Sequence, residues 1–488
     1  MNPIKRREFV RQALAALATT SLVPEHFRLA ASDPWKPSRT ARKRVIVLGA
    51  GLGGLSAAYE LSAAGHDVVI FEARRRPGGR ILTVRDPFAD GLYAELGATR
   101  ISDLNDWVLK YASAFGLTLE PFRTAGKDVI HLRGNRIVVA DERQVDWPLQ
   151  LTDEERRLGL PGMREKYMSA ALKEIGTADA PEPPPRTLAR YDSLSYAEFF
   201  RRQGASPAAA ELLTLGAGSN ENQDVSSLMR VRARVWRGRT TTWSKIRGGN
   251  DQLPKAFARG LADRIHYNTA ALHIEQSSTG VRVVVAQNGL RETVEGDYLV
   301  CTIPIPALRH LSIARAFPER VQTVIRDYGY QSATKVVLQT RSRFWEAEGL
   351  SGFATTDRPG QEVWNLAAAQ PGPRGLLMVY TNGLTIPHMA GPIEADRVAW
   401  GAREAEYLFP GLAHELEGGM SQCWDEDPWT RSANPMPRPG QVIEFLTILR
   451  HPIGRIVIAG DYASAWPGWM QGAIESGNHA ARAIDAAD

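Results

Sequence analysis

The sequence predicts an α/β protein that begins with a parallel β-α-β unit, and three observations support this. First, an apolar run starting at Arg44 leads into a glycine-rich turn and then into an alanine-rich stretch with helical periodicity. Second, another apolar run, "DVVIF", follows that stretch and ends beside Glu72. Third, isolated runs such as "DYLVC" and "RIVIA" have the length and composition of buried strands. Such alternation is typical of a parallel sheet with helices on its faces.

The turn after the first strand carries the pattern G-x-G-x-x-G at Gly49, Gly51 and Gly54. The first glycine permits a tight turn, the second lets a pyrophosphate approach the backbone, and the third lets the helix pack against the strand. Glu72, 23 positions after Gly49, is placed to accept hydrogen bonds from a ribose. The pattern predicts a dinucleotide site. NAD and FAD share it, and a purely structural glycine turn is the alternative.

Composition places the chain among globular proteins and argues against several function classes. Of its 488 residues, 43% are hydrophobic and 23% are charged, and the length predicts two or three subdomains. The net charge is only +5, and no basic run beyond the N-terminus would follow a phosphate backbone, so we expect no nucleic-acid partner. No stretch approaches the roughly 20 apolar residues of a membrane span. Two cysteines cannot build a disulfide scaffold, and no residues show metal-ligand spacing.

The N-terminal segment "KRREFVRQALAALATTSLV" has paired arginines, Arg6 and Arg7, ahead of Phe9 and a modestly apolar run. This pattern resembles a twin-arginine export signal, which we assign to residues 1–31. It predicts a periplasmic or secreted protein. A basic amphipathic first helix is the alternative, and the sequence does not fix a cleavage site.

Three further stretches carry a resemblance to a known family. "EARRRPGGRILT" contains Arg76, a glycine pair that lets the backbone pass close to a ligand, and Arg80, which can neutralise a diphosphate. "GGNDQLP" lies in the middle of the chain, and "IAGDYASAWPGWMQGAIESGNHAARAI" lies near its end. Together these landmarks, which extend from residue 44 to residue 485, resemble the flavin amine oxidases. Within that family the chain is most similar to secreted FAD-dependent L-amino-acid oxidases.

The resemblance implies a Rossmann-like FAD-binding domain, a discontinuous substrate-binding domain of mixed sheet and helices, and a helical subdomain. We expect residues 40–105, 245–305 and 445–488 to form the FAD-binding domain. Residues 106–244 are expected to form the largely helical subdomain, and residues 306–444 the substrate-binding domain.

FAD is the cofactor that the resemblance implies. It is expected to bind non-covalently, because "TRSANPMPRPGQ" lacks the cysteine through which some family members attach the flavin. Asp461 stands where glutamate is commoner in the family and is expected to contact the ribityl chain. A helix that begins near Gly472 would point its N-terminal dipole at the flavin. The expected cofactor contacts are Gly49, Gly51, Gly53, Gly54, Glu72, Arg76, Gly79, Arg80, Gly97, Ala98, Thr99, Arg100, Ala271, Gly460, Asp461 and Trp469.

The tetrapeptide "GATR" ends in Arg100, which matches the arginine that clamps the substrate α-carboxylate in L-amino-acid oxidases. A guanidinium suits that task because its planar fork donates two parallel hydrogen bonds to a carboxylate. Tyr380 matches a second donor to the same carboxylate, and a core aromatic is its alternative role. Trp469 matches the aromatic residue beside the substrate Cα and the flavin, and a packing role is its alternative.

Lys335 matches the family lysine that holds a water against flavin N5, so Lys335 and Trp469 are the expected catalytic residues. Val337 lies two positions after Lys335, which makes that face of the strand apolar and favours an inward lysine over a solvated edge charge. Trp424 and Trp364 are weaker candidates for flavin contact and for the side-chain pocket, and we assign them to the core by default.

The resemblance implies oxidative deamination of an L-amino acid. Hydride passes to the flavin, the imino acid hydrolyses to a 2-oxo acid and ammonia, and dioxygen becomes hydrogen peroxide. An amino-acid 2-monooxygenase, an amine or polyamine oxidase, and a dehydrogenase with another electron acceptor are alternatives. An exported flavoprotein that only binds is an alternative of a different class. The side-chain preference stays open, as does a homodimer.

Overall fold

The computed structural model describes six stretches of the chain: residues 41–123, 125–176, 182–216, 224–313, 316–383 and 389–487. The predicted export signal at residues 1–31 lies outside these ranges. None of the helices within them has the length and apolar character needed to cross a bilayer.

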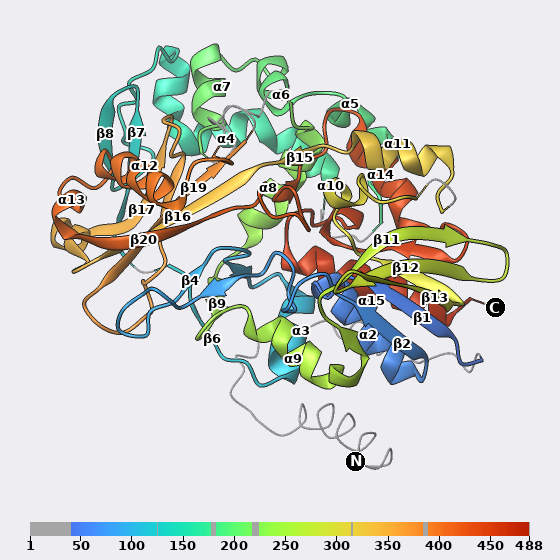
Figure 1. Cartoon of the computed structure of the whole chain (residues 1–488). Coiled ribbons are helices and arrows are strands. Elements are labelled where there is room, and N and C mark those ends of the chain that lie inside the picture. The colour runs from blue at the N-terminus through green and yellow to red at the C-terminus, as the bar shows by residue number, and fades with distance from the viewer. Residues whose placement is uncertain are drawn as a thin grey trace, which may run out of the picture.

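A five-stranded parallel sheet lies at the lower right of Figure 1, where β1 and β2 are labelled. Its order is β10 (Ile265–His266), β2 (Asp67–Phe71), β1 (Arg44–Leu48), β14 (Tyr298–Cys301) and β22 (Ile456–Ile458). Strands from three distant parts of the chain therefore meet in one sheet. The predicted β-α-β unit is present as β1, α2 (Leu52–Ala64) and β2.

Successive side chains of β1 point to opposite faces of this sheet, and both faces are buried. Val45 and Val47 pack into a core shared with α2 and α15 (Met470–Asp485). Ile46 and Leu48 pack on the other face, where the core is completed by the antiparallel strands β11 (Thr269–Gln276), β12 (Val281–Gln287) and β13 (Leu290–Gly296) and by the helices α11 (Glu319–Asp327) and α14 (Gln441–Arg450). A strand buried on both faces is apolar throughout, which is why these strands are visible in the sequence.

A seven-stranded sheet occupies the left of Figure 1. Its order is β20 (Leu416–Cys423), β16 (Ala333–Thr340), β19 (Gly375–Asn382), β18 (Glu362–Asn365), β17 (Leu350–Thr356), β7 (Lys127–Leu132) and β8 (Asn135–Val139). Val336 and Leu338 belong to the same core as Ala405 of α12 (Glu394–Glu406). Val337 packs on the opposite face with Trp364. Lys335 shares that second face, and it is only 5% exposed.

Residues 106–244, predicted to be largely helical, also contain the strands β6 (Leu119–Pro121), β7 and β8. The helices α4 (Asp153–Ile175), α6 (Tyr196–Arg202), α7 (Pro207–Leu213) and α8 (Ser227–Arg239) are present. Figure 1 shows α6 and α7 at the top, and α8 near the centre. The hairpin β7–β8, however, joins the seven-stranded sheet by pairing in parallel with β17. Arg133 and Gly134 both have positive φ (51° and 80°), as a two-residue hairpin turn requires. The two residues therefore favour a hairpin at this point, although helices follow it in the chain.

Candidate active site

A cavity of about 830 Å³ lies at the carboxyl ends of the parallel strands. Its wall includes residues that closely follow β1, β2, β14 and β22, namely Gly49, Glu72, Thr302 and Gly460. The carboxyl edge of an open parallel sheet is the usual place for a ligand in α/β folds. β16, β19 and α8 also contribute to the wall.

The glycine turn between β1 and α2 has the geometry of a phosphate site. Gly49 has φ +102°, and a Cβ there would lie 2.6 Å from Thr302 Oγ1. A Cβ at Gly54 would overlap the Gly49 carbonyl oxygen, so Gly54 is needed for packing of α2 against the turn. A Cβ at Gly51 would meet no protein atom within 4 Å. The N-terminus of α2 thus faces open space in the cavity wall, where backbone N–H groups can receive an anion.

Glu72 braces this turn from the end of β2. Its Oε2 accepts a hydrogen bond from the Ala50 N–H (2.7 Å), and its Oε1 accepts one from the Arg74 N–H (2.8 Å). Burial raises the pKa of Glu72, and the two N–H donors and the charge of Arg74 oppose that rise. Each carboxylate oxygen retains a second lone pair, so the group can still accept a hydrogen bond from a ribose hydroxyl.

Arg80 and Asp461 form an ion pair in the cavity wall. Arg80 also donates to the Ala433 carbonyl (2.6 Å), and Asp461 accepts from the Gly468 N–H (3.1 Å). Burial alone would lower the pKa of Arg80, but Asp461 holds it above its ordinary value. The pair joins the first part of the chain to its last part beside the glycine turn.

Arg76 differs from most of the other predicted cofactor residues. It donates to the carbonyl oxygens of Gly79 (3.0 Å), Ile81 (2.9 Å) and Pro77 (3.2 Å), and it does not line the cavity. Arg76 therefore supports the turn that contains Gly79, and the geometry gives no support to its predicted contact with the cofactor. Gly54 does not line the cavity either, because it packs against the Gly49 carbonyl. Eight further predicted positions do line it: Gly51, Gly53, Gly79, Gly97, Ala98, Thr99, Ala271 and Trp469.

Taken together, the open space at Gly51, the free helix N-terminus and the carboxylate of Glu72 suit a dinucleotide such as FAD. The helix α15 begins at Met470, two residues before the predicted start, and its first turn also lines the cavity. Its first turn holds no acidic residue that would oppose an electron-rich ring.

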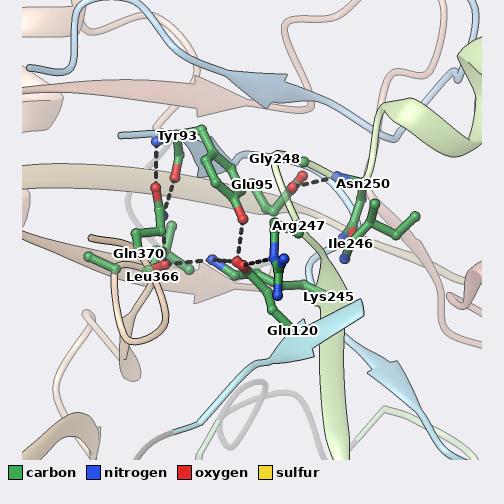
Figure 2. A network of polar contacts seen from close by, with 12 residues as sticks. Tyr93, Glu95, Glu120, Lys245, Ile246, Arg247, Gly248, Asn250, Leu366 and Gln370 are labelled. Carbon is green, nitrogen blue, oxygen red and sulfur yellow. Dashed lines mark hydrogen bonds and ion pairs between the residues drawn. The ribbon is translucent and has the colours of Figure 1, made fainter. Parts of the chain in front are cut away.

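The segment that ends in Arg100 is held by a buried polar network (Figure 2). The Asn250 N–H donates to Glu95 Oε1 (2.8 Å), and its side-chain amide donates to the carbonyls of Ala98 (2.9 Å) and Thr99 (3.1 Å). The side-chain Oδ1 of Asn250 accepts from the Ile246 N–H (2.9 Å). The motif "GGNDQLP" therefore fixes the "GATR" backbone directly.

The other half of the same network anchors neighbouring loops. Figure 2 shows Glu120 between the Tyr93 hydroxyl, which donates to it, and the ammonium of Lys245 at 3.4 Å. Lys245 also donates to the Leu366 carbonyl (2.9 Å), while Gln370 exchanges hydrogen bonds with the Tyr93 backbone (2.9 and 2.8 Å). These buried groups satisfy one another and tie together the segments that carry Tyr93, Glu120, Lys245 and Gln370.

Arg100 lies in the cavity wall with its charge uncompensated by any carboxylate in direct contact. Across the described ranges, its guanidinium makes no hydrogen bond or ion pair. It lies over the rings of Trp364 (4.6 Å), Trp243 (5.0 Å) and Trp469 (5.8 Å). Burial lowers the pKa of Arg100, and the charge of Glu362 opposes this. Five N–H donors thus border a cavity that can admit an anion.

Tyr380 and Lys335 lie beside one another in the cavity wall. The Lys335 ammonium is 4.9 Å from the centre of the Tyr380 ring. The Tyr380 hydroxyl accepts a hydrogen bond from Asn434 (3.3 Å), and burial raises the pKa of Tyr380. Its hydroxyl hydrogen remains available to a ligand. The structure thus brings together in one wall the four residues predicted to act on substrate, since Arg100 and Trp469 lie there as well.

Lys335 is saturated with protein acceptors. Its ammonium donates to Thr99 Oγ1 (2.6 Å), to the Gly97 carbonyl (2.5 Å) and, more weakly, to the Glu95 carbonyl (3.4 Å). Burial lowers its pKa to about 7, with Glu95 opposing and Arg100 adding to the shift. Since an ammonium has three donors, a bridging water would have to replace the long contact to Glu95.

Trp364 and Trp424 are buried, as their default assignment predicts, and both also line the cavity. Trp424 donates to the Leu96 carbonyl (2.9 Å). Three further residues of the wall, Trp243, Glu362 and Arg237, are not predicted from the sequence. Arg237 belongs to the arginine-rich run "RVRARVWRGR" of α8, which is the one sequence feature that could have drawn attention to it.

The described residues contain no group of three or more potential metal ligands. Cys301 and Cys423 are both buried, and burial raises the pKa of Cys301 to about 11. The Cys301 thiol is therefore not a reactive group at neutral pH.

Comparison with known proteins agrees with this geometry. Residues 52–485 match the family model of flavin-containing amine oxidoreductases. An L-amino-acid oxidase of Vipera ammodytes ammodytes is 28% identical over 458 residues, which cover 91% of this chain and 93% of the relative. One of Demansia vestigiata is 27% identical over 466 residues, covering 91% and 87%.

Solved structures share the fold at lower identity. A putrescine oxidase bound to putrescine superposes with a TM-score of 0.77 at 22% identity, covering 92% of this chain and all of that chain (100%). Cyclohexylamine oxidase from Brevibacterium oxydans IH-35A gives 0.77 at 23% identity, covering 91% and 99%. The predicted resemblance is confirmed, and the α/β architecture is that of amine oxidases. Because the family match spans nearly all of the described chain, the protein belongs to the flavin-containing amine oxidoreductases.

Proposed function

We propose that the protein binds FAD non-covalently and oxidises L-amino acids to 2-oxo acids, releasing ammonia and hydrogen peroxide. The observation that carries the proposal is the position of Arg100. A buried guanidinium without an anionic partner is costly, and an α-carboxylate entering the cavity would supply that partner. Relatives named as L-amino-acid oxidases that cover nine-tenths of the chain support the same substrate class.

The chain's own residues would act by binding and orientation. Arg100 and the Tyr380 hydroxyl hold the carboxylate, while Trp469 and Trp364 exclude water around the Cα–H bond. Desolvation in this aromatic site lowers the pKa of the substrate ammonium, so the amine loses its proton before oxidation. The Lys335 ammonium donates to the Gly97 carbonyl and to Thr99 Oγ1. We expect Lys335 to assist the step in which dioxygen is reduced. The bound flavin would supply the two-electron acceptor.

A diamine is a poorer candidate, although putrescine oxidase shares the fold. A second ammonium would enter a wall that already carries Arg100 and Lys335, and like charges within a low-dielectric site repel strongly. An amino-acid 2-monooxygenase would use the same carboxylate contact, so product analysis has to separate it from an oxidase.

The test compares each neutral L-amino acid that bleaches the flavin anaerobically with the amine that it gives on decarboxylation. In Arg100→Ala, kcat/KM for the amino acid is expected to fall by about 100-fold or more, because removing one partner of a buried charged pair costs about 3 kcal/mol or more. The amine is expected to change by less than about threefold, since it makes no such contact. Equal losses for both would contradict the carboxylate role. Carbon dioxide and an amide in the aerobic products would identify a monooxygenase.

A further inference from the structure

The cavity wall carries more positive charge than an α-carboxylate needs. Helix α8 contributes Arg234 and Arg237 to the wall in addition to Arg100. Residues three apart lie on the same face of a helix, so both arginines of α8 point toward the same side. A second cavity of about 440 Å³ shares Arg100, Arg234 and Glu362 with the first, which places these charges where the two cavities meet.

Arg237 is the least compensated of these groups. Its Nε is buried without a hydrogen-bond partner, and its ring contact is with the adjacent Trp236 at 5.3 Å. Burial and the neighbouring cations Arg100 and Arg234 together lower the pKa of Arg237 to about 9. A guanidinium in such a position is stabilised by an anion that enters from the cavity.

The described part of the wall offers little negative charge at this end. Its carboxylates are Glu72 and Asp461, which belong to the dinucleotide end, and Glu362. Glu362 Oε2 accepts a hydrogen bond from the Trp364 indole N–H (2.9 Å). Glu362 is therefore the one carboxylate that the described wall offers beside Arg100, Arg234 and Arg237. Arg123 and Arg164 of the second cavity differ from these, because each is paired, with Asp128 and Glu142 respectively.

We propose that the enzyme acts on L-amino acids whose side chain ends in a carboxylate, with Arg237 and Arg234 forming a subsite for that group while Arg100 binds the α-carboxylate. This inference rests on the proposed function and names its substrate class. A 2-aminodicarboxylic acid supplies both anions that the wall lacks. A neutral side chain would leave Arg237 uncompensated, and a basic side chain would add a further cation.

The first test measures anaerobic flavin reduction with L-glutamate and L-aspartate and with their neutral isosteres, L-glutamine and L-asparagine. A site built around buried polar groups rejects a ligand that lacks their partner by large factors, so at least one acid is expected to exceed its amide by about 100-fold in kcat/KM. Arg237→Gln and Arg234→Gln are expected to remove most of this preference. The control is Arg239→Gln, because Arg239 lies exposed on the same helix and outside the cavity wall.

A binding measurement separates this proposal from the oxidation itself. Glutarate and pentanoate have no amine and are not oxidised, and their dissociation constants follow from the perturbation of flavin absorbance in the holoenzyme. Glutarate is expected to bind at least about tenfold more tightly than pentanoate, and Arg237→Gln to abolish the difference. Equal binding of the two acids, or faster oxidation of glutamine than of glutamate, would overturn the acidic subsite while leaving amino-acid oxidation intact. Tight glutarate binding without reduction of the flavin by any L-amino acid would support the subsite and overturn the proposed function.

Discussion

Substitution of Gly51 by alanine is expected to separate folding from flavin binding. Gly51 has φ −72° and ψ 174°, which alanine adopts without strain, and its added Cβ would meet no protein atom within 4 Å. Loss of a favourable N-cap residue costs about 0.5–1 kcal/mol, and the reduced entropy of the unfolded chain offsets about 0.4–1 kcal/mol of that. The flavin-free protein should therefore unfold within about 1 kcal/mol of the wild type.

The same substitution is expected to weaken FAD binding strongly. The same methyl group would occupy the space through which a pyrophosphate approaches the N-terminus of α2. Displacing the phosphates from two backbone donors costs about 1.5–3 kcal/mol for each charge-assisted hydrogen bond. Flavin affinity should then fall by about 100-fold or more, since each 1.4 kcal/mol is about tenfold.

The assay is titration of flavin-free Gly51→Ala with FAD, followed by fluorescence quenching, together with calorimetric unfolding in the absence of flavin. Gly418→Ala is the matched control, because a Cβ at Gly418 also meets no protein atom within 4 Å but the residue lies on β20, outside the cavity wall. Gly54→Ala should fail at folding, since its Cβ overlaps the Gly49 carbonyl oxygen. Wild-type flavin affinity in Gly51→Ala would refute the assignment of the phosphate site.

Two further predictions follow from the buried groups around Arg100. Burial lowers the pKa of Lys335 from 10.5 to about 7, so between those values the unfolded chain binds more protons than the folded one and stability rises with pH. From pH 7 to 9 the unfolding temperature of the wild type should rise relative to that of Lys335→Met, and parallel curves for the two proteins would contradict the lowered pKa. Asn250→Ala removes three hydrogen bonds to the backbone at Ile246, Ala98 and Thr99 and should destabilise the fold by about 2–3 kcal/mol. It should also raise KM for amino acids more than it lowers kcat, and an unchanged KM in steady-state assays would show that Asn250 does not position Arg100.

The parts of the fold that could be predicted from the sequence are those whose signal is local. β1, α2 and β2 form one continuous pattern, because the strand is apolar on both faces and the glycine turn has a fixed spacing. The hairpin β7–β8 was missed because its place in the seven-stranded sheet depends on pairing with β17, more than 200 residues away in the chain. Pairing between such distant strands leaves no mark in either stretch alone.

The residues of the candidate site also fall into two groups, those that the sequence predicts and those that only the fold reveals. Arg100 and Lys335 could be predicted because each belongs to a short stretch that resembles the family. Trp243 and Trp364 are ordinary strand residues in the sequence, and only the fold places their rings over Arg100. Arg237 is likewise one arginine among several in α8, and its buried, unpartnered Nε depends on which face of the helix turns inward.

The tryptophans around Arg100 partly stabilise its charge without an ion pair, which leaves the guanidinium able to bind a ligand. Each indole face attracts a nearby cation by about 0.5–2 kcal/mol, which offsets only part of the several kcal/mol needed to bury a charge. Glu362 is the carboxylate best placed to supply the rest, yet its Oε2 accepts the Trp364 indole N–H at 2.9 Å and forms no ion pair with Arg100. Trp364 thus contributes twice, since its ring faces the guanidinium while its N–H engages the competing carboxylate. The uncompensated part of the charge is what a substrate carboxylate would satisfy, and the same rings would exclude the water that could otherwise screen it.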